Sequence, residues 1–398
     1  MAADRDCDAL ITGIGLVSCL GEGEGAHWAA LDAPEGFAPV VDQTRFAPWP
    51  VHAMAKLDLD RQIPKKGDQR QMEAWQRIGV HAAGLALDDA GIKGDGDLLK
   101  RMDMIVAAGG GERDYAVDEA ILAAMGQTAD PEALLNERLM ADLRPTLFLA
   151  QLSNLLAGSI SIVHGVVGSS RTFMGEEAAG ADAVRTACAR IEAGQGDLFL
   201  VGGSYNAERP DTFLINEAGG LLWKRPFLPV WARQATGGGM VLGSVGCFLV
   251  IESRAHATAR GRAPIARIAA VMTDRCARGP GEATAVATKQ LTAMAPLLQP
   301  GPRMVISAAS GVHAITAEEQ AFLDSQGLPV RAVGTALGHS LEAAFPACIA
   351  LAAISVTQGR PFAPLEAAEA PSEAEFREAL VTSWGIWRGE AMALITRA

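Results

Sequence analysis

The stretch that decides the fold is ALITGIGLVS, residues 9–18. Its first half, Ala9–Gly13, predicts a buried strand that runs into a glycine-rich turn, because a short apolar run bounded by glycine is typical of buried strands. The same pattern predicts further buried strands at Met104–Ala108, Leu198–Val201, Cys247–Ile251 and Met304–Ala308. Helical patterns separate these runs. Strands that alternate with helices indicate an α/β fold with largely parallel sheets.

A long helix is predicted between the first two strands. We expect Asp68 to cap it and Gly91 to follow its end, since acidic residues favour helix starts and glycine favours the position after the last turn. Between them, residues recur at helical spacing: Met72, Trp75, Ile78, Gly79, Ala82 and Leu85.

The composition excludes some function classes. The chain has 398 residues, which suggests two or three packing units. Hydrophobic residues make up 49% and charged residues 20%, enough for a large buried core. With 34 basic and 46 acidic residues the net charge is −12, so the chain lacks the global basic footprint of a nucleic-acid-binding protein. An acidic chain can still carry a local basic patch.

The six cysteines are scattered and form no CxxC pair, which indicates a reducing compartment and isolated thiols, not disulfides or a zinc site. The first eight residues lack the layout of a secretion signal, and no apolar run reaches the ~18 residues that a membrane span requires. We therefore expect a cytoplasmic protein with no membrane span, no metal and no cofactor. The cysteines are Cys7, Cys19, Cys188, Cys247, Cys276 and Cys348.

Three glycine-rich segments invite a nucleotide-binding interpretation, and none supports it. Gly13–Ser18 lacks the third glycine of a dinucleotide loop and the acidic residue that should follow about twenty residues later. Gly109–Gly111 and Gly237–Gly239 lack the Lys-Ser/Thr of a phosphate-binding loop. Close backbone packing is the better account of these glycines.

His339 differs from the other six histidines because it lies in a glycine-bounded turn that enters an alanine-rich helix. A helix N-terminus favours the neutral imidazole, which can donate a hydrogen bond to a carbonyl oxygen. A purely structural role for His339 remains open at this point.

Several segments resemble the β-ketoacyl-acyl carrier protein synthase family. They are ITGIGLVS (11–18), QRQMEA (69–74), LSNLLAG (152–158), DLFLVGG (197–203), GSVGCFLVIE (243–252), AHA (255–257) and GH (338–339). These segments occur in the family's order along nearly the whole chain. The resemblance implies a thiolase-type α/β fold with layered αβαβα sheets and helices, usually assembled as a dimer. It also implies two similar halves, which we place at residues 1–252 and 253–398.

The resemblance further implies the family's chemistry, in which a cysteine at a helix N-terminus takes up an acyl chain and two histidines and a lysine support it. The segment TFMGEEAAG (172–180) matches the nucleophile region, and the cysteine position falls on Glu177. Glu177 lies 25 residues before Gly202, as the family pattern requires, whereas Cys188 lies only 14 residues before it. Cys188 is therefore expected inside a helix as a small buried side chain.

The other catalytic positions of the family are also replaced. The first histidine position falls on Ala309 or Ser310, while His313 comes about three residues too late and is expected at the surface. The lysine position, five residues before the second histidine, is Gly334, so only His339 remains. The glycine-rich loop near the C-terminus becomes WGIWRG (384–389), whose two tryptophans and arginine should fill space that the family keeps open.

These replacements predict a protein of fatty acid or polyketide synthesis that does not condense acyl chains and instead pairs with an active synthase, as chain-length factors do. A carboxylate cannot form the acyl thioester, and an ionised Glu177 would repel a malonyl carboxylate. Two alternatives stay open. Glu177 and His339 could act as an acid–base pair on a carrier-bound acyl chain, or the protein could be an acyl-binding scaffold without turnover.

We expect a dimer, of one chain type or two, through the strand ending near Thr172 and the adjoining Leu152–Gly158. Small and apolar residues at Leu147–Leu156, with Leu155 and Phe148 among them, suit the wall of an acyl tunnel. A basic cluster of Lys65, Lys66 and Arg70 would attract an acidic acyl carrier protein, although a solvated loop explains it equally well.

Overall fold

The computed structural model describes residues 5–145, 147 and 151–398. Its main feature is one eleven-stranded sheet with the order β11-β10-β12-β13-β9-β1-β8-β6-β4-β5, in which β2 pairs with β1 outside this path. A two-stranded sheet pairs β3 with β7. The strands are β1 (Ala9–Ser18), β2 (Gly21–Glu22), β3 (Val51–His52), β4 (Asp103–Ala107), β5 (Ser170–Phe173), β6 (Leu198–Tyr205), β7 (Leu242–Gly243), β8 (Val245–Ser253), β9 (Ala266–Asp274), β10 (Met304–Ser307), β11 (Val330–Ala332), β12 (Glu378–Trp384) and β13 (Glu390–Thr396).

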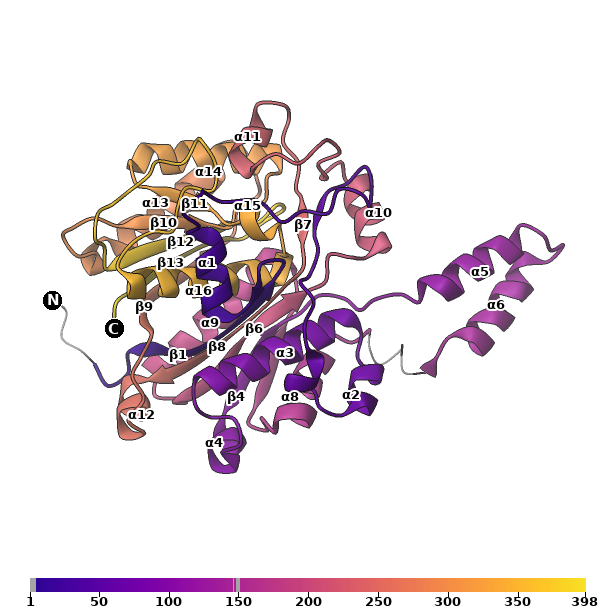
Figure 1. The fold of residues 1–398 in the computed structure, drawn as a ribbon, viewed down its shortest axis with the longest axis horizontal. Helices are drawn as coiled ribbons and strands as arrows, with labels where there is room; N and C mark the ends of the chain where they lie inside the picture. The colour runs from indigo at the N-terminus through magenta and orange to yellow at the C-terminus, as the bar shows by residue number, and fades with distance from the viewer. Residues whose placement is uncertain (1–4, 146, 148–150) are drawn as a thin grey trace.

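The helices connect these strands and cover both faces of the sheet (Figure 1). They are α1 (Gly23–Leu31), α2 (Lys66–Gln71), α3 (Ala74–Asp89), α4 (Gly96–Arg101), α5 (Tyr115–Met125), α6 (Pro131–Asp142), α8 (Leu155–His164), α9 (Glu176–Glu192), α10 (Pro210–Ala218), α11 (Val230–Gln234), α12 (Arg254–Ala259), α13 (Glu282–Met294), α14 (His313–Gln326), α15 (Gly334–Leu337) and α16 (Ala344–Gln358). Three short 3-10 turns complete them: η1 (Leu59–Arg61), η2 (Ala295–Leu297) and η3 (Leu341–Ala343).

The long sheet consists of two blocks of five strands with the same internal order. The first block runs from the free edge inward in the order β5-β4-β6-β8-β1, and the second in the order β11-β10-β12-β13-β9. When the strands of each block are counted along the chain, both orders read 3-2-4-5-1. The first strands of the two blocks, β1 and β9, join them by a short antiparallel pairing at Ala9–Ile11. This repeated order supports our proposal of two similar halves divided near residue 252.

The sheet is mixed, not largely parallel as the sequence suggested. The outer strands of each block pair in parallel, whereas the central pairs β6–β8, β8–β1, β1–β9, β9–β13 and β13–β12 are antiparallel. The first strand is also longer than predicted. β1 continues through Gly13 and Gly15 to Ser18. Both glycines lie against the backbone of α3, where a Cβ would come within 2.4 Å of a carbonyl oxygen at Gly13 and within 1.9 Å of one at Gly15. These glycines serve close packing, not a turn.

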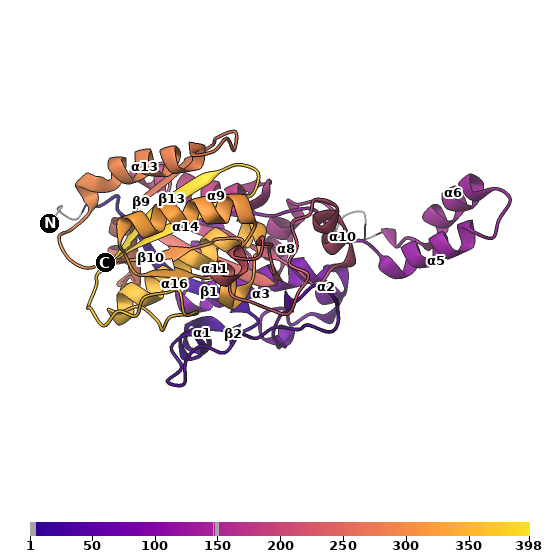
Figure 2. The ribbon, with the colours of Figure 1, turned by 90° about the horizontal axis from the view of Figure 1, so that it is seen from above.

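Helices α9 and α16 form the central layer of the molecule. Each contacts strands of both blocks, and they contact each other. α3 and α8 cover the outer face of the first block, and α13 and α14 that of the second, where Figure 2 shows α13 along one face of the molecule. The result is the five-layer αβαβα arrangement expected of a thiolase-type fold.

One helical stretch among the described residues, Leu341–Gln358, is long and apolar enough to span a membrane by length and composition alone, which the sequence reading did not anticipate. It comprises η3 and α16, and 83% of it is buried inside the protein. Its apolar character follows from its place between the two sheet blocks, where almost every side chain of α16 is in the core.

The long helix predicted from Asp68 is interrupted. Asp68 lies in the first turn of the short α2, and a break at Met72–Glu73 precedes α3. Glu73 caps α3 through a reciprocal capping box with Gln76, which stabilises a new helix start there. The predicted end is confirmed, since Gly91 follows α3 with a φ of +65°.

Helices α5 and α6 form an antiparallel arm that extends away from the body of the protein (Figures 1 and 2). The two helices contact each other, and the arm exposes large apolar side chains, with Leu122 69% and Met140 82% exposed. An arm with exposed apolar residues is more typical of an interaction surface than of a solvated loop.

Candidate functional site

The N-terminus of α9 carries the residue that the sequence places at the nucleophile position. The chain reaches it from edge strand β5 through Gly175 at a φ of +118° and Glu176 at a φ of +60°. A positive φ at a glutamate is a strained conformation that must be held by its surroundings. This tight turn directs Glu177, the second residue of α9, into the protein interior.

Glu177 and His339 form a buried pair. His339 Nε2 lies 2.8 Å from Glu177 Oε1, and both residues are only 2% exposed. The backbone N–H of Ile386 also donates to Glu177 Oε1 at 3.4 Å. The structure thus brings together the two residues that the sequence singled out as the remains of a catalytic site.

The turn that contains His339 is anchored to the small sheet of β3 and β7. The His339 N–H donates to the carbonyl of Val241 at 2.8 Å, and its carbonyl accepts from Gly243 at 3.0 Å. Gly338 has a φ of +73°, and a Cβ there would lie 2.7 Å from Gly243, so only glycine fits. These contacts fix the backbone of His339 opposite the start of α9.

The Glu177 carboxyl is ionised by its partners. Complete burial by itself raises its pKa, but the hydrogen bond and charge of His339, together with the backbone N–H groups of Glu177 and Ile386, outweigh burial and hold the pKa below its usual value. The pair is therefore a carboxylate stabilised by an imidazolium or by an imidazole N–H. This agrees with the ionised Glu177 expected from the sequence.

A cavity of about 440 Å³ adjoins the pair, within the range of small-molecule sites. Its lining combines apolar side chains with several charged and polar ones. The residues that line it are Trp75, Gly109, Gly110, Gly111, Glu176, Glu177, Ser204, Tyr205, Asn206, Arg209, Asp211, Thr212, Ile215, Asn216, Leu341, Glu342, Ile386 and Trp387.

Glu342 is a site residue that the sequence analysis missed. It lies in η3, three residues after His339, is 5% exposed and lines the cavity beside Glu176 and Glu177. Burial raises the pKa of its carboxyl to about 7, and the charges of Glu177 and Glu176 add to this effect. A charged residue at the start of an otherwise apolar core helix was the signal that could have identified it.

The two other replaced catalytic positions are neighbours. A Cβ on Gly334 would lie 2.7 Å from the carbonyl oxygen of Ala309, so the proposed lysine position adjoins one of the two residues proposed for the first histidine position. Ser310, the other candidate for the histidine position, is buried and its Oγ accepts from the N–H of Val312 at 3.2 Å. Neither Ala309 nor Ser310 lines the cavity. His313 begins α14 at the surface, as predicted.

Only part of the loop Trp384–Gly389 fills space at the cavity, whereas the sequence suggested that both tryptophans and the arginine would do so. Ile386 and Trp387 line the cavity, and Trp387 is 57% exposed. Trp384 instead ends β12 and packs in the core against Phe322, with ring centroids 5.6 Å apart, because alternate strand residues face opposite sides. Arg278 fastens the loop by donating to the carbonyl of Gly385 and pairing with Glu390.

In the described part of the chain no cysteine lines the cavity. Cys188 lies within α9, more than two turns after Glu177, as expected, but its residue is only partly buried. Desolvation of the thiol raises its pKa to about 12. A thiol with so high a pKa is a poor nucleophile at neutral pH. The sequence-based rejection of Cys188 as the nucleophile is consistent with this placement.

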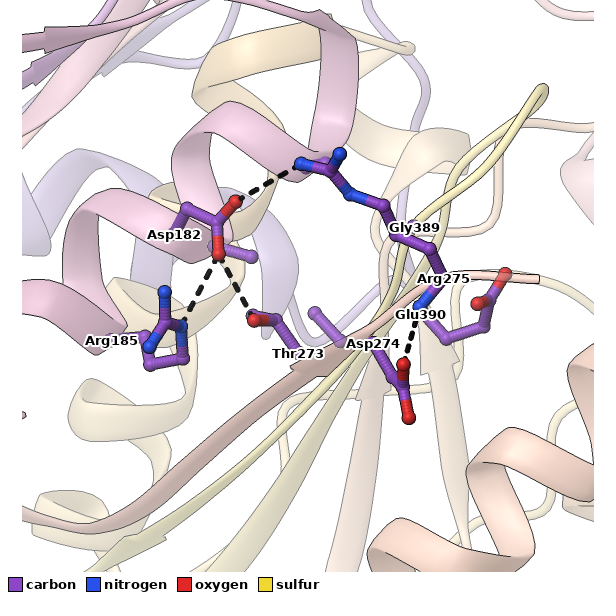
Figure 3. A pocket seen from close by; sticks show the side chains of 10 residues that line it. Asp182, Arg185, Thr273, Asp274, Arg275, Gly389 and Glu390 are labelled. Carbon is purple, nitrogen blue, oxygen red and sulfur yellow. Dashed lines mark hydrogen bonds and ion pairs between the residues drawn. The ribbon is translucent and has the colours of Figure 1, made fainter.

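A second hollow of about 320 Å³ lies between α9 and the adjoining ends of β9 and β13 (Figure 3). Asp182 accepts hydrogen bonds from Arg185 at 3.2 Å and Thr273 at 3.0 Å, and Arg275 lies 3.7 Å away on the other side. Asp274 and Glu390, which also line the hollow, pair with Lys289 and Arg278 outside it. Among the described residues, no group of three or more histidine, cysteine, aspartate or glutamate side chains is arranged to hold a metal ion.

Comparison with known proteins assigns the family. A model of the beta-ketoacyl synthase N-terminal domain matches residues 8–257. The actinorhodin polyketide putative beta-ketoacyl synthase 2 of Streptomyces coelicolor is 30% identical over 264 residues, 64% of this chain and 60% of that protein. The match thus spans about three-fifths of the length of this relative.

Two further comparisons extend over more of the chain. The tetracenomycin polyketide synthase ketoacyl synthase beta subunit of Streptomyces glaucescens is 29% identical over 370 residues, 87% of this chain and 85% of that protein. The solved structure of the ishigamide ketosynthase/chain length factor aligns over 100% of both chains with a TM-score of 0.79 and 22% identity, a likeness of fold. On the match of the family model, the chain belongs to the beta-ketoacyl synthase family.

Proposed function

We propose that this protein is a non-condensing partner of an active ketosynthase, similar in role to a chain-length factor, in fatty acid or polyketide synthesis. The observation that carries the proposal is the buried Glu177–His339 pair at the start of α9. A carboxylate engaged by an imidazole cannot accept an acyl chain as a thioester, and its negative charge opposes an incoming malonyl carboxylate.

The neighbouring replacements support the same proposal. Ala309 or Ser310 stands at the first histidine position and Gly334 at the lysine position, and none of them is the histidine or lysine of the family, so three catalytic positions are changed together. The relatives add to this support. They include a protein named putative beta-ketoacyl synthase 2, a ketoacyl synthase beta subunit and a ketosynthase/chain length factor.

An exposed strand edge and exposed apolar side chains fit the partner subunit of this proposal. β5 ends the sheet, and Ser170 and Arg171 in it are exposed, so its outer edge is free to pair with a second chain. Large apolar side chains are exposed on the segments that precede and follow it and on the nearby arm and α10. They are Leu122, Leu139, Met140, Leu152, Ile162, Val167, Met174, Leu214 and Ile215.

The first test asks whether the isolated protein forms an acyl-enzyme. We expect no covalent adduct after incubation with acyl carrier protein loaded with an acyl chain, or with a cysteine-directed synthase inhibitor, when intact mass is measured. An active ketosynthase treated in parallel serves as the positive control. Stoichiometric acylation of any residue, Cys188 included, would overturn the proposal.

The second test concerns the partner and the product. Co-expression with an active synthase should give a mixed dimer, and changing the size of Leu155 in this chain should alter the length of the product without abolishing turnover. Leu155 lies at the start of α8 and is partly buried. Phe148, the other wall residue named from the sequence, lies outside the described residues. An unchanged product distribution with an intact mixed dimer would remove the chain-length role and leave a scaffold.

Carrier-protein docking is proposed through the basic cluster at the start of α2. Lys65 and Arg70 are exposed, while Lys66 is partly neutralised by Asp60 at 2.5 Å. Replacing Lys65 and Arg70 by glutamate should weaken binding and reduce its dependence on salt, because both effects follow from the loss of charge attraction. The matched variant Lys289→Glu changes a lysine on α13 and should leave binding unchanged. Equal binding by all three proteins would show that the cluster does not dock the carrier.

The alternative, an enzyme with altered chemistry, draws on one observation. Glu177 lines the cavity and its Oε2 has no hydrogen-bond partner among the described residues, so this oxygen could accept a proton from a bound molecule. Turnover of carrier-bound acyl chains by the isolated protein, lost in Glu177→Gln, favours this alternative. Activity found only in the mixed dimer favours the proposed partner role.

A further inference from the structure

The cavity beside α9 contains an unusual set of unpaired polar atoms. Glu176, Glu177 and Glu342 all line it, and each has a buried Oε2 atom without a hydrogen-bond partner among the described residues. Glu342 and Glu177 are at least 95% buried. Unpaired carboxylate oxygens in a protein interior are costly, and natural proteins keep few of them unless a ligand or bound water satisfies them.

An independent observation is an unpaired hydrogen-bond donor at the same cavity. Trp75 lines the same cavity, is 2% exposed, and its indole N–H has no partner among the described residues. A buried indole N–H usually finds an acceptor. Tyr205 also lines the cavity, and its buried hydroxyl likewise has no partner among the described residues. The cavity thus presents unpaired carboxyl oxygens together with two unpaired donors, the indole of Trp75 and the hydroxyl of Tyr205.

Other charges at the cavity are already engaged. The Arg209 guanidinium donates to Asp211 at 2.6 Å and 3.1 Å and to the carbonyl of Gly111 at 2.7 Å. An anionic ligand would therefore meet three carboxyl groups and no free cation among these lining residues. A saturated acyl chain would leave the carboxylates and the indole unpaired. A primary ammonium group has three N–H donors, which matches three unpaired oxygens.

We propose that the cavity binds a short chain that carries a protonated primary amine and a carbonyl, such as an aminoacyl group. The ammonium lies among the carboxylates of Glu176, Glu177 and Glu342, and the carbonyl oxygen accepts from the indole of Trp75. Charge-assisted hydrogen bonds of this kind are stronger than those between neutral groups. The inference goes beyond the proposed partner role, since it concerns binding to the isolated chain.

Gly109 creates the space for this arrangement. A Cβ at Gly109 would lie 2.8 Å from Glu342 Oε1, so an alanine there displaces the Glu342 carboxylate without changing its charge. Gly109→Ala therefore tests the position of the Glu342 carboxyl group.

The test measures binding of 5-aminopentanamide to the full chain by calorimetry, with hexanamide as the neutral ligand of the same shape. We expect the amine to bind about tenfold or more tightly than hexanamide, the range for hydrogen bonds to charged groups. Glu342→Gln should reduce this preference to about twofold, and Gly109→Ala should weaken it. Glu319→Gln, a change at another buried glutamate that lies outside the cavity, should retain it.

A second ligand tests the contact between the carbonyl and Trp75. n-Pentylamine, which lacks the carbonyl, should bind more weakly than 5-aminopentanamide, and Trp75→Phe should remove that difference. Circular dichroism and thermal unfolding of each variant show whether it is folded. Equal binding of the amine and hexanamide, or no binding of either to the folded protein, overturns the inference. Both results leave the proposed partner role untouched, because that role is tested by acylation and co-purification.

Discussion

Glu342 is a buried carboxyl whose protonation should couple to the stability of the protein. Burial and the neighbouring charges of Glu177 and Glu176 raise its pKa from 4.5 to about 7. Because the pKa is raised in the folded state, keeping Glu342 neutral contributes to the free energy of unfolding. This contribution is fully present below about pH 4.5 and is lost as the pH rises through about 7. Glu342→Gln, which stays neutral, should therefore gain stability relative to the parent between pH 5 and pH 8, by at most about 3 kcal/mol.

Urea unfolding at pH 5 and pH 8 measures this change in the free energy of unfolding. Glu373→Gln, at an exposed position, provides the control and should show no such change with pH. An equal effect of Glu342→Gln at both pH values would mean that the carboxyl is ionised across this range.

The Glu177–His339 pair should behave as a unit. His339→Gln leaves the Glu177 carboxylate buried without its imidazole partner, and an uncompensated buried charge of this kind typically costs about 3–5 kcal/mol. Adding Glu177→Gln removes the uncompensated charge, so the double variant should be more stable than His339→Gln alone. A double-mutant cycle on the free energy of unfolding gives the coupling directly. Additive effects of the two substitutions would show that the pair is not coupled.

At this scale the sequence identified Glu177 and His339 because the spacing to Gly202 and the glycine-bounded turn are local features. It missed Glu342 and the cavity role of Trp75. Trp75 belongs to the apolar repeat of α3, and only the packing of α3 against the loops after β4 and β6 reveals that it lines the cavity. Burial and missing hydrogen-bond partners are properties of the folded chain and leave no pattern in the sequence.

Among the elements, edge strand β5 offers a sharp test of the proposed interface. Ser169 and Phe173 direct their carbonyls to β4, so the backbone groups of the alternating residue Thr172 point to the free edge. Thr172→Pro should remove an N–H available to a second chain without removing a hydrogen bond to β4, and so weaken dimer formation. Thr172→Val keeps the N–H and serves as the control.

Sedimentation velocity of both variants measures the oligomeric state. We expect Thr172→Val to associate like the parent, and Thr172→Pro to shift toward monomer at concentrations where the parent is dimeric. A dimer of unchanged affinity in Thr172→Pro would place the interface elsewhere, for example on the arm of α5 and α6.

Element positions were predicted where local patterns decide them. The buried cores of β4, β6, β8 and β10 lie where apolar runs predicted them, and the glycine after α3 marks its end. The helix start at Asp68 was wrong because the capping box of Glu73 and Gln76 begins a separate helix. The antiparallel centre of the sheet could not be predicted, because strand direction depends on which distant strands become neighbours.

For the whole molecule, the central layer should make unfolding a single cooperative event. α16 contacts β8 and β1 of the first block and β12, β13 and β9 of the second, and α9 likewise contacts both blocks. Residues 1–252 alone would expose the faces that α16 covers, among them the apolar residues of β8. We therefore expect neither half to fold independently, although their strand orders repeat.

Urea unfolding followed by circular dichroism and by tryptophan fluorescence should give coincident transitions, since both signals then report one event. Ile349→Ala in α16 removes a fully buried side chain and should lower the free energy of unfolding by about 2–5 kcal/mol, with the same shift in both signals. The exposed substitution Ile162→Ala on α8 is the matched control and should change little. Two separated transitions, with Ile349→Ala moving only one, would show that the halves unfold independently and that the central layer does not couple them.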